Sequence, residues 1–368
     1  MSKAAELANL IGNINAGGGG VNRNLIINGN FVVAQRGTSF SNVTSSQFCL
    51  DRFSVDVSGG GAFNVTQDTS APEGFEKSLK LEVNTADSSI AAADAYRVTQ
   101  AVEGQNISQA DLGASTAKAM ALSFYVKSSV TGTYGVGLAN NAETENFVAE
   151  YTINSANTWE KKTINIPVRT SGTWLTDNSV GIGVRFDLGS GTDYNGTAGQ
   201  WQTTSAKVYR TSSCVNLIAT GSATWFLTGV QLEIGQNPTS FEHEPFDRTL
   251  VKCQRYFENV ASYGGSGTPT QSYWQGILTH QYTTSRMFGR FIYKVIKRAT
   301  PTVTVHNHEF AFASATDSRT LSNNPQNTYA DISGVGLDFQ NQGTNYTGGE
   351  SGHVDLAGTC YITSDAEL

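Results

Sequence analysis

Short segments in which apolar and polar residues alternate are the feature that most restricts the fold of this chain. In SLKLEVN (78–84), Leu79, Leu81 and Val83 fall on one face of an extended strand, and the polar residues between them fall on the other. Further segments of strand character lie at 52–57, 63–67, 96–104, 118–129, 132–140, 147–154, 161–168, 180–189 and 224–235. About ten strands at hairpin-like spacing, with no helix between them, predict a mainly β protein built on a two-sheet sandwich.

The length and composition of the chain agree with a β-rich protein of more than one part. Its 368 residues allow two or three domains, and a content of 38 Gly with only 15% charged residues is typical of many turns rather than long helices. A Gly/Ser/Thr-rich segment at 263–272 separates the strands above from a second β-rich stretch. We therefore expect a helix and Gly-rich tether at 1–21, a β-sandwich at 22–245, a connecting helix at 246–262 and a smaller C-terminal β domain at 263–368.

Charge, hydropathy and cysteine content argue against several classes of protein. A net charge of −7 and a pI near 5.3 do not suit a general nucleic-acid binder, which needs a basic face. No apolar run reaches the length of about 18 residues that a membrane-spanning helix needs, and no secretory signal is evident, so we expect no membrane insertion. The four cysteines are far apart, which predicts buried free thiols rather than a disulfide framework or a zinc site.

The N-terminal segment KAAELANLIGNI (3–14) has the spacing of a short amphipathic helix. Leu7, Ala8, Ile11 and Ile14 fall on one apolar stripe, and a run of glycines at 17–20 follows as a flexible tether. A helix of about three turns is not stable alone in water, so its stripe needs a partner. We expect these residues to attach the chain to another polypeptide, and a disordered start is the alternative.

Three segments carry a resemblance to known families. The opening NLIINGNFVVAQRGTSF (24–40) with CLDRF (49–53), and WFLTGVQLEIGQNPTSFEHEPFDRTLVKCQRYF (225–257), resemble bacteriophage tail-fibre and related virion appendage proteins. The middle segment, with ALSFYVKSS, GTYGVGL and YTINSANTWEKKTINIPV, resembles the jelly-roll of carbohydrate-binding modules. The resemblance covers roughly 24–257. It implies that NGNF (28–31) is the first edge hairpin, with Asn-Gly supplying the positive φ of a tight turn.

The resemblance also implies a function. It indicates a structural tail-fibre protein or adhesin, assembled in the host cytoplasm into the virion as a homotrimer. Its N-terminus would bind the phage tail, the baseplate or another fibre protein, and its β domains would bind a host surface polysaccharide. We expect the C-terminal domain to be the host-facing end. A virion decoration or connector protein that binds no glycan, and a free carbohydrate-binding module, are the alternatives.

A glycan-degrading, tailspike-like enzyme is a further alternative, and the sequence does not favour it. None of the five histidines lies in a GxSxG or HExxH context. A carboxylate pair in a groove would suffice for glycan cleavage and is not recognisable from sequence. We expect no enzymatic activity, no catalytic residues and no organic cofactor.

Loop aromatics with polar neighbours are the candidates for glycan binding, because sugar rings stack on aromatic faces beside hydrogen-bonding groups. Such residues are Trp174, Tyr194 and Trp201 in the sandwich, and Tyr273, Trp274 and Tyr282 in the C-terminal part. Packing of each ring beneath its own loop is the alternative. Trp159 and Trp225, at the starts of strands, are predicted to be core residues.

His306 and His308 in TVTVHNHEF (302–310) form a possible metal site. Two residues apart, they point to the same face of a strand. Near a three-fold axis such a pair would present six imidazoles, which suits an octahedral metal ion. An exposed polar strand end is the alternative interpretation.

Overall fold

A computed structural model describes most of the chain. The described residues are 2–6, 23–262, 277–283, 286–306, 310–313, 318–320, 325, 327–340, 351–356 and 360–368. The chain divides into two compact units, Met1–Thr249 with Leu368, and Leu250–Glu367. Both units are built from antiparallel strands, so the predicted mainly β class is confirmed. Within the described residues, no helix has both the length and the apolar character needed to cross a membrane.

One layer of the first unit is a six-stranded antiparallel sheet. Its order is β1 (Ser39–Val43), β4 (Ala62–Asp68), β5 (Ser78–Thr85), β13 (Thr224–Ile234), β7 (Met120–Ser128) and β10 (Glu160–Ile166). The late strand β13 lies between β5 and β7, so a strand from near the C-terminal end of the unit lies at the centre of this sheet. Strand β5 has the predicted alternation, with Leu79, Leu81 and Val83 buried.

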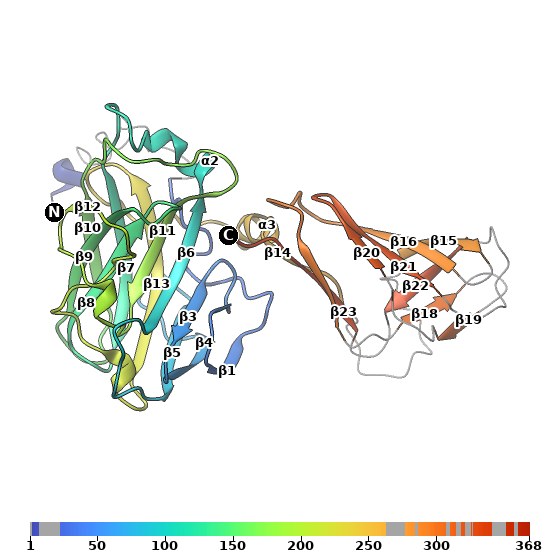
Figure 1. Cartoon of the computed structure of the whole chain (residues 1–368), viewed down its shortest axis with the longest axis horizontal. Helices are drawn as coiled ribbons and strands as arrows, with labels where there is room; N and C mark the ends of the chain where they lie inside the picture. The colour runs from blue at the N-terminus through green and yellow to red at the C-terminus, as the bar shows by residue number, and fades with distance from the viewer. Residues whose placement is uncertain are drawn as a thin grey trace. The chain divides into compact units, whose positions relative to one another are not determined.

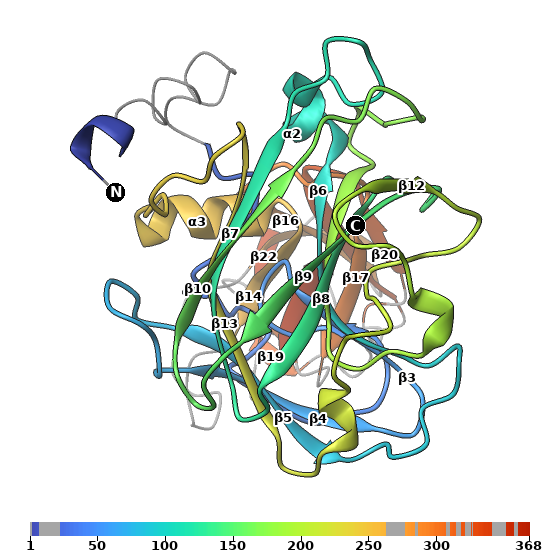
Figure 2. The ribbon, with the colours of Figure 1, turned by 90° about the vertical axis from the view of Figure 1, so that its left-hand side faces the viewer.

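The other layer is a seven-stranded sheet. Its order is β12 (Trp201–Thr203), β9 (Glu145–Ile153), β8 (Gly132–Ala139), β11 (Val180–Asp187), β6 (Ala95–Glu103), β3 (Ser54–Ser58) and β2 (Gln47–Phe48). Figure 1 labels the strands, and Figure 2 shows the two layers, with β7, β10 and β13 on one side of the sandwich and β6, β8 and β9 on the other. The expected jelly-roll-like sandwich is therefore present, and each of the predicted strand segments contains a strand.

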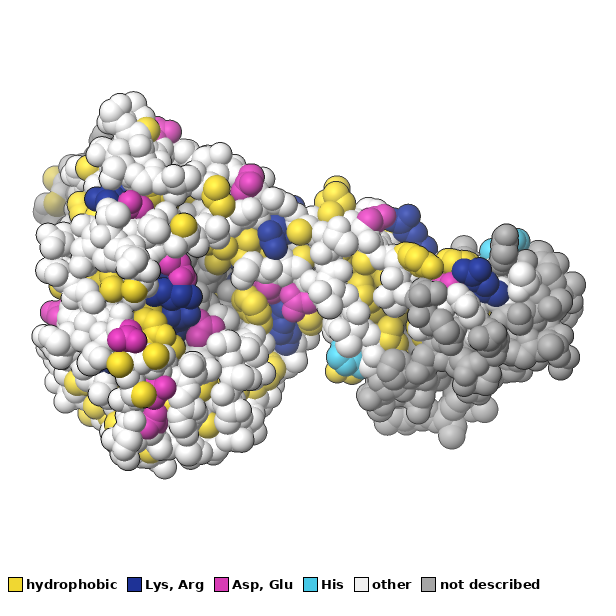
Figure 3. Space-filling view, viewed as in Figure 1, with side chains coloured by type: hydrophobic (Ala, Val, Ile, Leu, Met, Phe, Trp, Pro, Cys, Tyr) yellow, Lys and Arg dark blue, Asp and Glu magenta, His cyan; other side chains and the backbone are white. Residues whose placement is uncertain are grey.

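The outer face of the seven-stranded sheet carries paired charges. Figure 3 shows basic side chains flanked by acidic and apolar ones over β6 and β11. Arg97 on β6 donates to Asp56 at 2.8 Å, and Arg185 on β11 donates to Glu143 at 2.7 Å. The guanidinium of Arg97 also lies over the ring of Tyr209. Charge on this face is thus largely neutralised within the protein.

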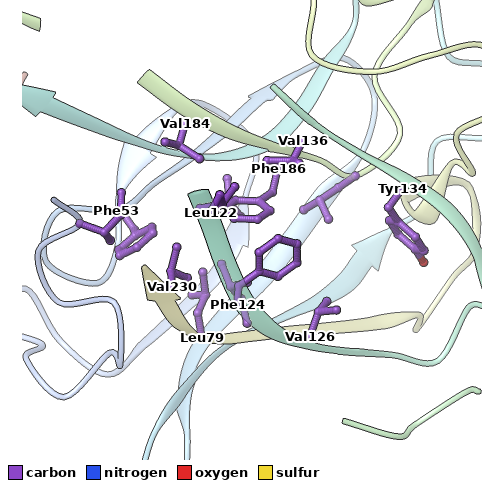
Figure 4. Packing of buried hydrophobic residues seen from close by; sticks show 14 of the residues in the cluster. Phe53, Leu79, Leu122, Phe124, Val126, Tyr134, Val136, Val184, Phe186 and Val230 are labelled. Carbon is purple, nitrogen blue, oxygen red and sulfur yellow. The ribbon is translucent and has the colours of Figure 1, made fainter. Parts of the chain in front are cut away.

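The core of the sandwich lies between the two sheets and is formed by the inward-facing residues of both (Figure 4). Leu79, Leu122 and Phe124 from one sheet meet Val184 and Phe186 from the other, all at most 1% exposed. The rings of Phe124 and Phe186 pack edge to face with their centroids 5.0 Å apart. Burial of each such side chain stabilises the fold by about 1.5–3 kcal/mol, so this interface dominates the stability of the unit.

The predicted NGNF hairpin is wrong in its pairing. Residues 23–38 contain no strand, and the first strand begins at Ser39. Asn28 and Phe31 take positive φ values of 60° and 56°, and the Asn28 side chain holds the turn through Val33. Gly29 is required for a different reason: a Cβ there would come within 2.1 Å of the Val230 carbonyl oxygen. Leu25, Ile26 and Phe31 are buried in the core instead of pairing with each other.

The second unit has a small sheet and a larger one. The small sheet has the order β14 (Phe257–Ser262), β23 (Tyr361–Asp365), β17 (Thr302–His306). The larger has the order β19 (Ser318–Thr320), β18 (Phe310–Ala313), β22 (Ser351–Leu356), β15 (Ile277–Thr283), β16 (Arg286–Ile292), β21 (Gly334–Phe339), β20 (Asn327–Ala330). Among the described residues of this unit, the buried cluster includes Met287, Val335, Leu337, Phe339 and Ile362.

The helix predicted at 246–262 is shorter than expected. Helix α3 covers Phe246–Gln254, and β14 begins at Phe257. The segment FENVAS pairs with YITSD of β23, and this strand pairing replaces the last predicted turns of helix.

At the N-terminus, Lys3–Glu6 are helical, while Leu7, Ala8, Ile11 and Ile14 lie outside the described residues. The cysteines Cys49, Cys214, Cys253 and Cys360 are buried free thiols, as predicted. Burial raises the pKa of the Cys49 thiol to about 12, which makes it unreactive.

Candidate functional site

Two of the predicted glycan-binding residues meet at one edge of the sandwich. The rings of Trp174 and Trp201 pack edge to face with centroids 5.5 Å apart, at an interplanar angle of 87°. Both rings are half-buried, so each has one part against the protein and one part open to solvent. Trp174 lies in the loop between β10 and β11, and Trp201 begins β12. Strand pairing and loop packing therefore bring together residues from separate loops.

Trp201 is held by both its strand and its indole nitrogen. It pairs with Phe147 in the β12–β9 ladder, and the two ring centroids are 5.5 Å apart. The indole N–H donates to the Pro167 carbonyl at 2.8 Å. Phe147 is buried in the core, so Trp201 extends the core outward to the surface. This anchoring fixes the plane of the Trp201 ring before any ligand arrives.

Trp174 is held by the loop around it. Its indole N–H donates to the Ser171 carbonyl at 3.1 Å. The buried amide of Asn140 donates to the neighbouring Thr173 carbonyl at 3.0 Å. Gly113, at φ 86°, passes so close that a Cβ would lie 2.9 Å from the Trp174 ring. These contacts restrict Trp174 to one position, which lowers the conformational entropy that a ligand would otherwise have to remove.

An ion pair lies next to the tryptophans. The Arg169 guanidinium donates from Nε to the Glu145 carboxylate at 2.7 Å, and from Nη2 to both Glu145 and Thr203. Glu145 is buried at the start of β9 and pairs with Thr203 in the β9–β12 ladder. The loop at Gly172, φ 90°, packs directly on the Glu145 side chain. The pair is electrically neutral as a unit, and it ties the Trp174 loop to the strand that carries Trp201.

This arrangement offers rigid aromatic surface beside polar groups without net charge. Both indole N–H groups already donate to backbone carbonyls, so the rings present their π faces and edges rather than a free donor. Sequence reasoning identified the tryptophans but missed Arg169, Glu145 and Thr203. Arg169 directly follows the strand segment 161–168, and no local signal shows that its partner lies 24 residues earlier on another strand.

Tyr194 does not join the tryptophan pair. Its ring packs against Tyr209 with centroids 4.8 Å apart, and its hydroxyl donates to the Ala93 carbonyl at 3.0 Å. Tyr194 is half-buried, and its role in glycan binding remains a prediction. In the second unit, Tyr282 lies in β15, while Tyr273 and Trp274 lie outside the described residues.

His306 ends strand β17 and is engaged with the neighbouring strand. Its ring stacks on Tyr361 with centroids 4.0 Å apart, and Nε2 lies 3.0 Å from the Thr363 hydroxyl. His308 lies outside the described residues, so the geometry of the predicted pair is not seen. Among the described residues, no group of three or more His, Cys, Asp and Glu side chains is placed to hold a metal ion. The His306/His308 metal site remains a prediction.

Of the two tryptophans predicted to be core residues, Trp225 is fully buried and Trp159 is not. Trp159 lies half-buried on the outer face of the six-stranded sheet. There its ring is 6.1 Å from that of Phe226 and 5.2 Å from the Lys127 ammonium.

Comparison with known proteins gives distant likenesses only. No protein-family model matches the chain. No curated protein matches it either. Among solved structures, the chain is similar to the enzymatically active domain of tailspike protein 4 of bacteriophage CBA120, with a TM-score of 0.31 and 15% identity. That match covers 58% of this chain but only 21% of the tailspike chain, so this chain spans about a fifth of it.

Two sugar-binding proteins are similar at the same level. A putative sugar-binding protein from Bacteroides thetaiotaomicron has a TM-score of 0.31 and 14% identity, over 57% of this chain and 99% of that chain. A family 11 carbohydrate-binding module from Clostridium thermocellum, in complex with a mixed-linked tetrasaccharide, has a TM-score of 0.28 and 11% identity, over 56% and 97%. The fold assignment rests on the strand pairing described above and not on these likenesses.

Proposed function

We propose that this protein is a structural tail-fibre protein or adhesin of a bacteriophage virion, and that the Trp174–Trp201 edge binds a host surface glycan. The observation that carries the proposal is the convergence of two half-buried tryptophans beside the Arg169–Glu145 pair. Hexose rings stack on aromatic faces, and neighbouring polar groups bind their hydroxyls. Because the polar groups are neutral as a set, the favoured ligand is an uncharged saccharide.

Attachment to the particle is assigned to the N-terminal segment. The apolar stripe of Leu7, Ala8, Ile11 and Ile14 would bind the tail, the baseplate or another fibre protein, with the glycine run as tether. A homotrimer, assembled in the host cytoplasm, would present several weak glycan sites at once. Linked sites raise the effective concentration, so contacts of millimolar affinity would sum to firm attachment.

Glycan binding is tested first on the full-length chain. Calorimetric titration with a panel of neutral oligosaccharides (gluco-, galacto- and xylo-oligomers) and with purified bacterial surface polysaccharides should identify a ligand. Trp174→Ala and Trp201→Ala should each weaken binding about 30-fold. Trp159→Ala is the matched control, since Trp159 is also half-buried but lies on the outer face of the other sheet. Equal loss in all three variants would contradict a site at the Trp174–Trp201 edge.

The virion role is tested by deleting residues 1–20. Phage particles should lose the protein while the truncated chain keeps its oligomeric state and its glycan binding. A protein that enters particles but binds no glycan would instead be the decoration or connector protein. Shortening of a polysaccharide during incubation would indicate the enzyme. A monomer at all concentrations would remove the multivalent part of the proposal.

A further inference from the structure

A hollow of about 380 Å³ lies in the first unit, lined by residues other than those of the tryptophan edge. Three separate segments form it: the turn at 30–32, the loop at 74–77 and the segment 243–246 that leads into α3. Its size is at the lower end of small-molecule sites, which commonly measure about 300–1,000 Å³. The walls contain both aromatic rings and carboxylates, among them Phe75, Glu76, His243, Glu244 and Phe246.

One wall of the hollow is a rigid group of rings. The lining residues Phe75 and His243 have ring centroids 5.1 Å apart, and both pack against Phe241, at 5.0 and 4.9 Å respectively. Phe75 also packs against Tyr125 on β7, at 5.3 Å. Gly229, at φ 61°, makes room for it, since a Cβ there would lie 2.7 Å from the Phe75 ring. The wall is therefore anchored on the six-stranded sheet and does not depend on a ligand for its shape.

Phe246 completes the hollow from the first position of α3. It is 57% exposed, although full burial of a Phe side chain would stabilise the fold by about 1.5–3 kcal/mol. A single exposed apolar residue is ordinary on a protein surface. Here, however, the exposed ring borders a concavity that already has an aromatic wall and two carboxylates.

The charges of the lining residues favour a ligand with a positive charge. Glu76 and Glu244 are acidic and Lys77 is basic, so the three give a net charge of −1. The faces of aromatic rings carry negative electrostatic potential and attract cations in the same way as carboxylates. Anionic ligands would be repelled by both features. A compact cation would be stabilised by both.

We propose that this hollow is a second binding site, specific for a small ligand that carries an ammonium group. Two sources share this chemistry, an amino sugar with a protonated amine and a choline-like quaternary ammonium group. The site is independent of the Trp174–Trp201 edge, because none of its lining residues belongs to that edge. Failure of the proposed glycan function would therefore leave this second site unaffected, and the reverse also holds.

The experiment is ligand-detected NMR of the full-length chain with glucosamine, choline, N-acetylglucosamine and glucose at pH 7. Saturable binding of glucosamine but not N-acetylglucosamine would support an amino-sugar site, and saturable binding of choline would support the quaternary source. Equal binding of the neutral sugars, or no binding of either ammonium ligand at millimolar concentration, would overturn the proposal.

Variants of the lining give effects of opposite sign, which a merely structural role would not produce. Phe246→Ala and Glu76→Gln should each weaken ammonium binding about tenfold, by loss of a ring face or of a charge. Lys77→Gln should strengthen it about threefold, because a competing positive charge is removed. Tyr329→Ala, which removes an equally exposed aromatic ring in the second unit, is the matched control and should bind as the parent protein does. Weaker binding in Lys77→Gln would contradict the electrostatic basis of the site.

Discussion

The two aromatic groups of the first unit differ in how their polar neighbours are arranged. At the Trp174–Trp201 edge, Arg169 and Glu145 neutralise each other and the indole N–H groups donate to backbone carbonyls. At the hollow beside Phe75 and Phe246, the lining includes two acidic residues and one lysine together with aromatic rings. The same kind of side chain therefore suits a neutral ring in one place and a cation in the other. The charge balance around the rings, and not the rings alone, determines the class of ligand.

The largest expected effect is on the ion pair that supports the tryptophan edge. Glu145→Ala should destabilise the protein by about 3 kcal/mol, because the half-buried Arg169 would be left without its counter-charge. Chemical denaturation of the full-length chain measures this change. Glu82→Ala is the matched control, since its pair with Lys80 is much more exposed and should cost less than about 1 kcal/mol. Similar losses in both variants would mean that the Arg169–Glu145 pair has no special structural role.

Truncation of a tryptophan should have the next largest effect. Trp201→Ala should weaken binding of the neutral saccharide about 30-fold, the equivalent of about 2 kcal/mol, as expected for a central aromatic contact. The same change should leave glucosamine or choline binding at the hollow unaltered. Titrations of one variant with both ligands therefore separate the two sites. Parallel losses at both would show that they are one site or that the variant is misfolded.

A change in salt concentration should alter ligand affinity differently at the two sites, by a smaller factor than the tryptophan substitution does. An increase from about 0.05 to 0.5 M NaCl should weaken ammonium binding at the hollow about threefold, because screening reduces the attraction to Glu76 and Glu244. Saccharide binding at the tryptophan edge should change by less than about 1.5-fold, since no net charge is involved there. The measurement is a pair of titrations at each salt concentration. If salt weakened saccharide binding more than ammonium binding, the ligands assigned to the two sites would have to be exchanged.

The smallest effect concerns Glu160, next to the control residue Trp159. Despite the opposing effect of desolvation, hydrogen bonds from Lys162, Ser155 and Asn154 lower the pKa of Glu160 to about 2. A carboxyl whose pKa is lower in the folded state stabilises the protein above its unfolded pKa of about 4.5, and this stabilisation is lost as the pH falls towards 2.

Glu160→Gln should therefore cost about 0.5 kcal/mol at pH 7, after allowance for screening by solvent, and less at pH 3. Denaturation of both proteins at pH 7, 4 and 3 checks the trend. A cost that stays constant or grows as the pH falls would contradict the assigned cause.

Period-two patterning predicted the strands of the sandwich because one face of each strand must be buried. The same alternation also indicates which face of its strand each of Trp159 and Trp225 occupies. Trp225 alternates with Leu227 and faces the core, whereas Trp159 alternates with Lys161 and faces solvent, opposite Ile164 and Ile166. The phase of the alternation, and not the position at a strand start, was the informative signal.

Contacts between distant segments could not be predicted in this way. Loop aromatics with polar neighbours indicated Trp174 and Trp201, but their contact depends on the pairing of β12 with β9 and on the loop after β10. The hollow combines segments near residues 30, 75 and 245, none of which has a local binding motif. The NGNF turn was misassigned because the close approach of the Val230 carbonyl to Gly29 is a tertiary contact.

The central claim is that the Trp174–Trp201 edge binds a neutral glycan. The most direct test is an NMR titration of the full-length chain that follows the five indole N–H signals, assigned by single Trp→Phe variants, as the bound saccharide is added. If this edge binds the saccharide, the signals of Trp174 and Trp201 should shift in a saturable manner while those of Trp159 and Trp225 stay in place. Saccharide binding that leaves the Trp174 and Trp201 signals unmoved would contradict it.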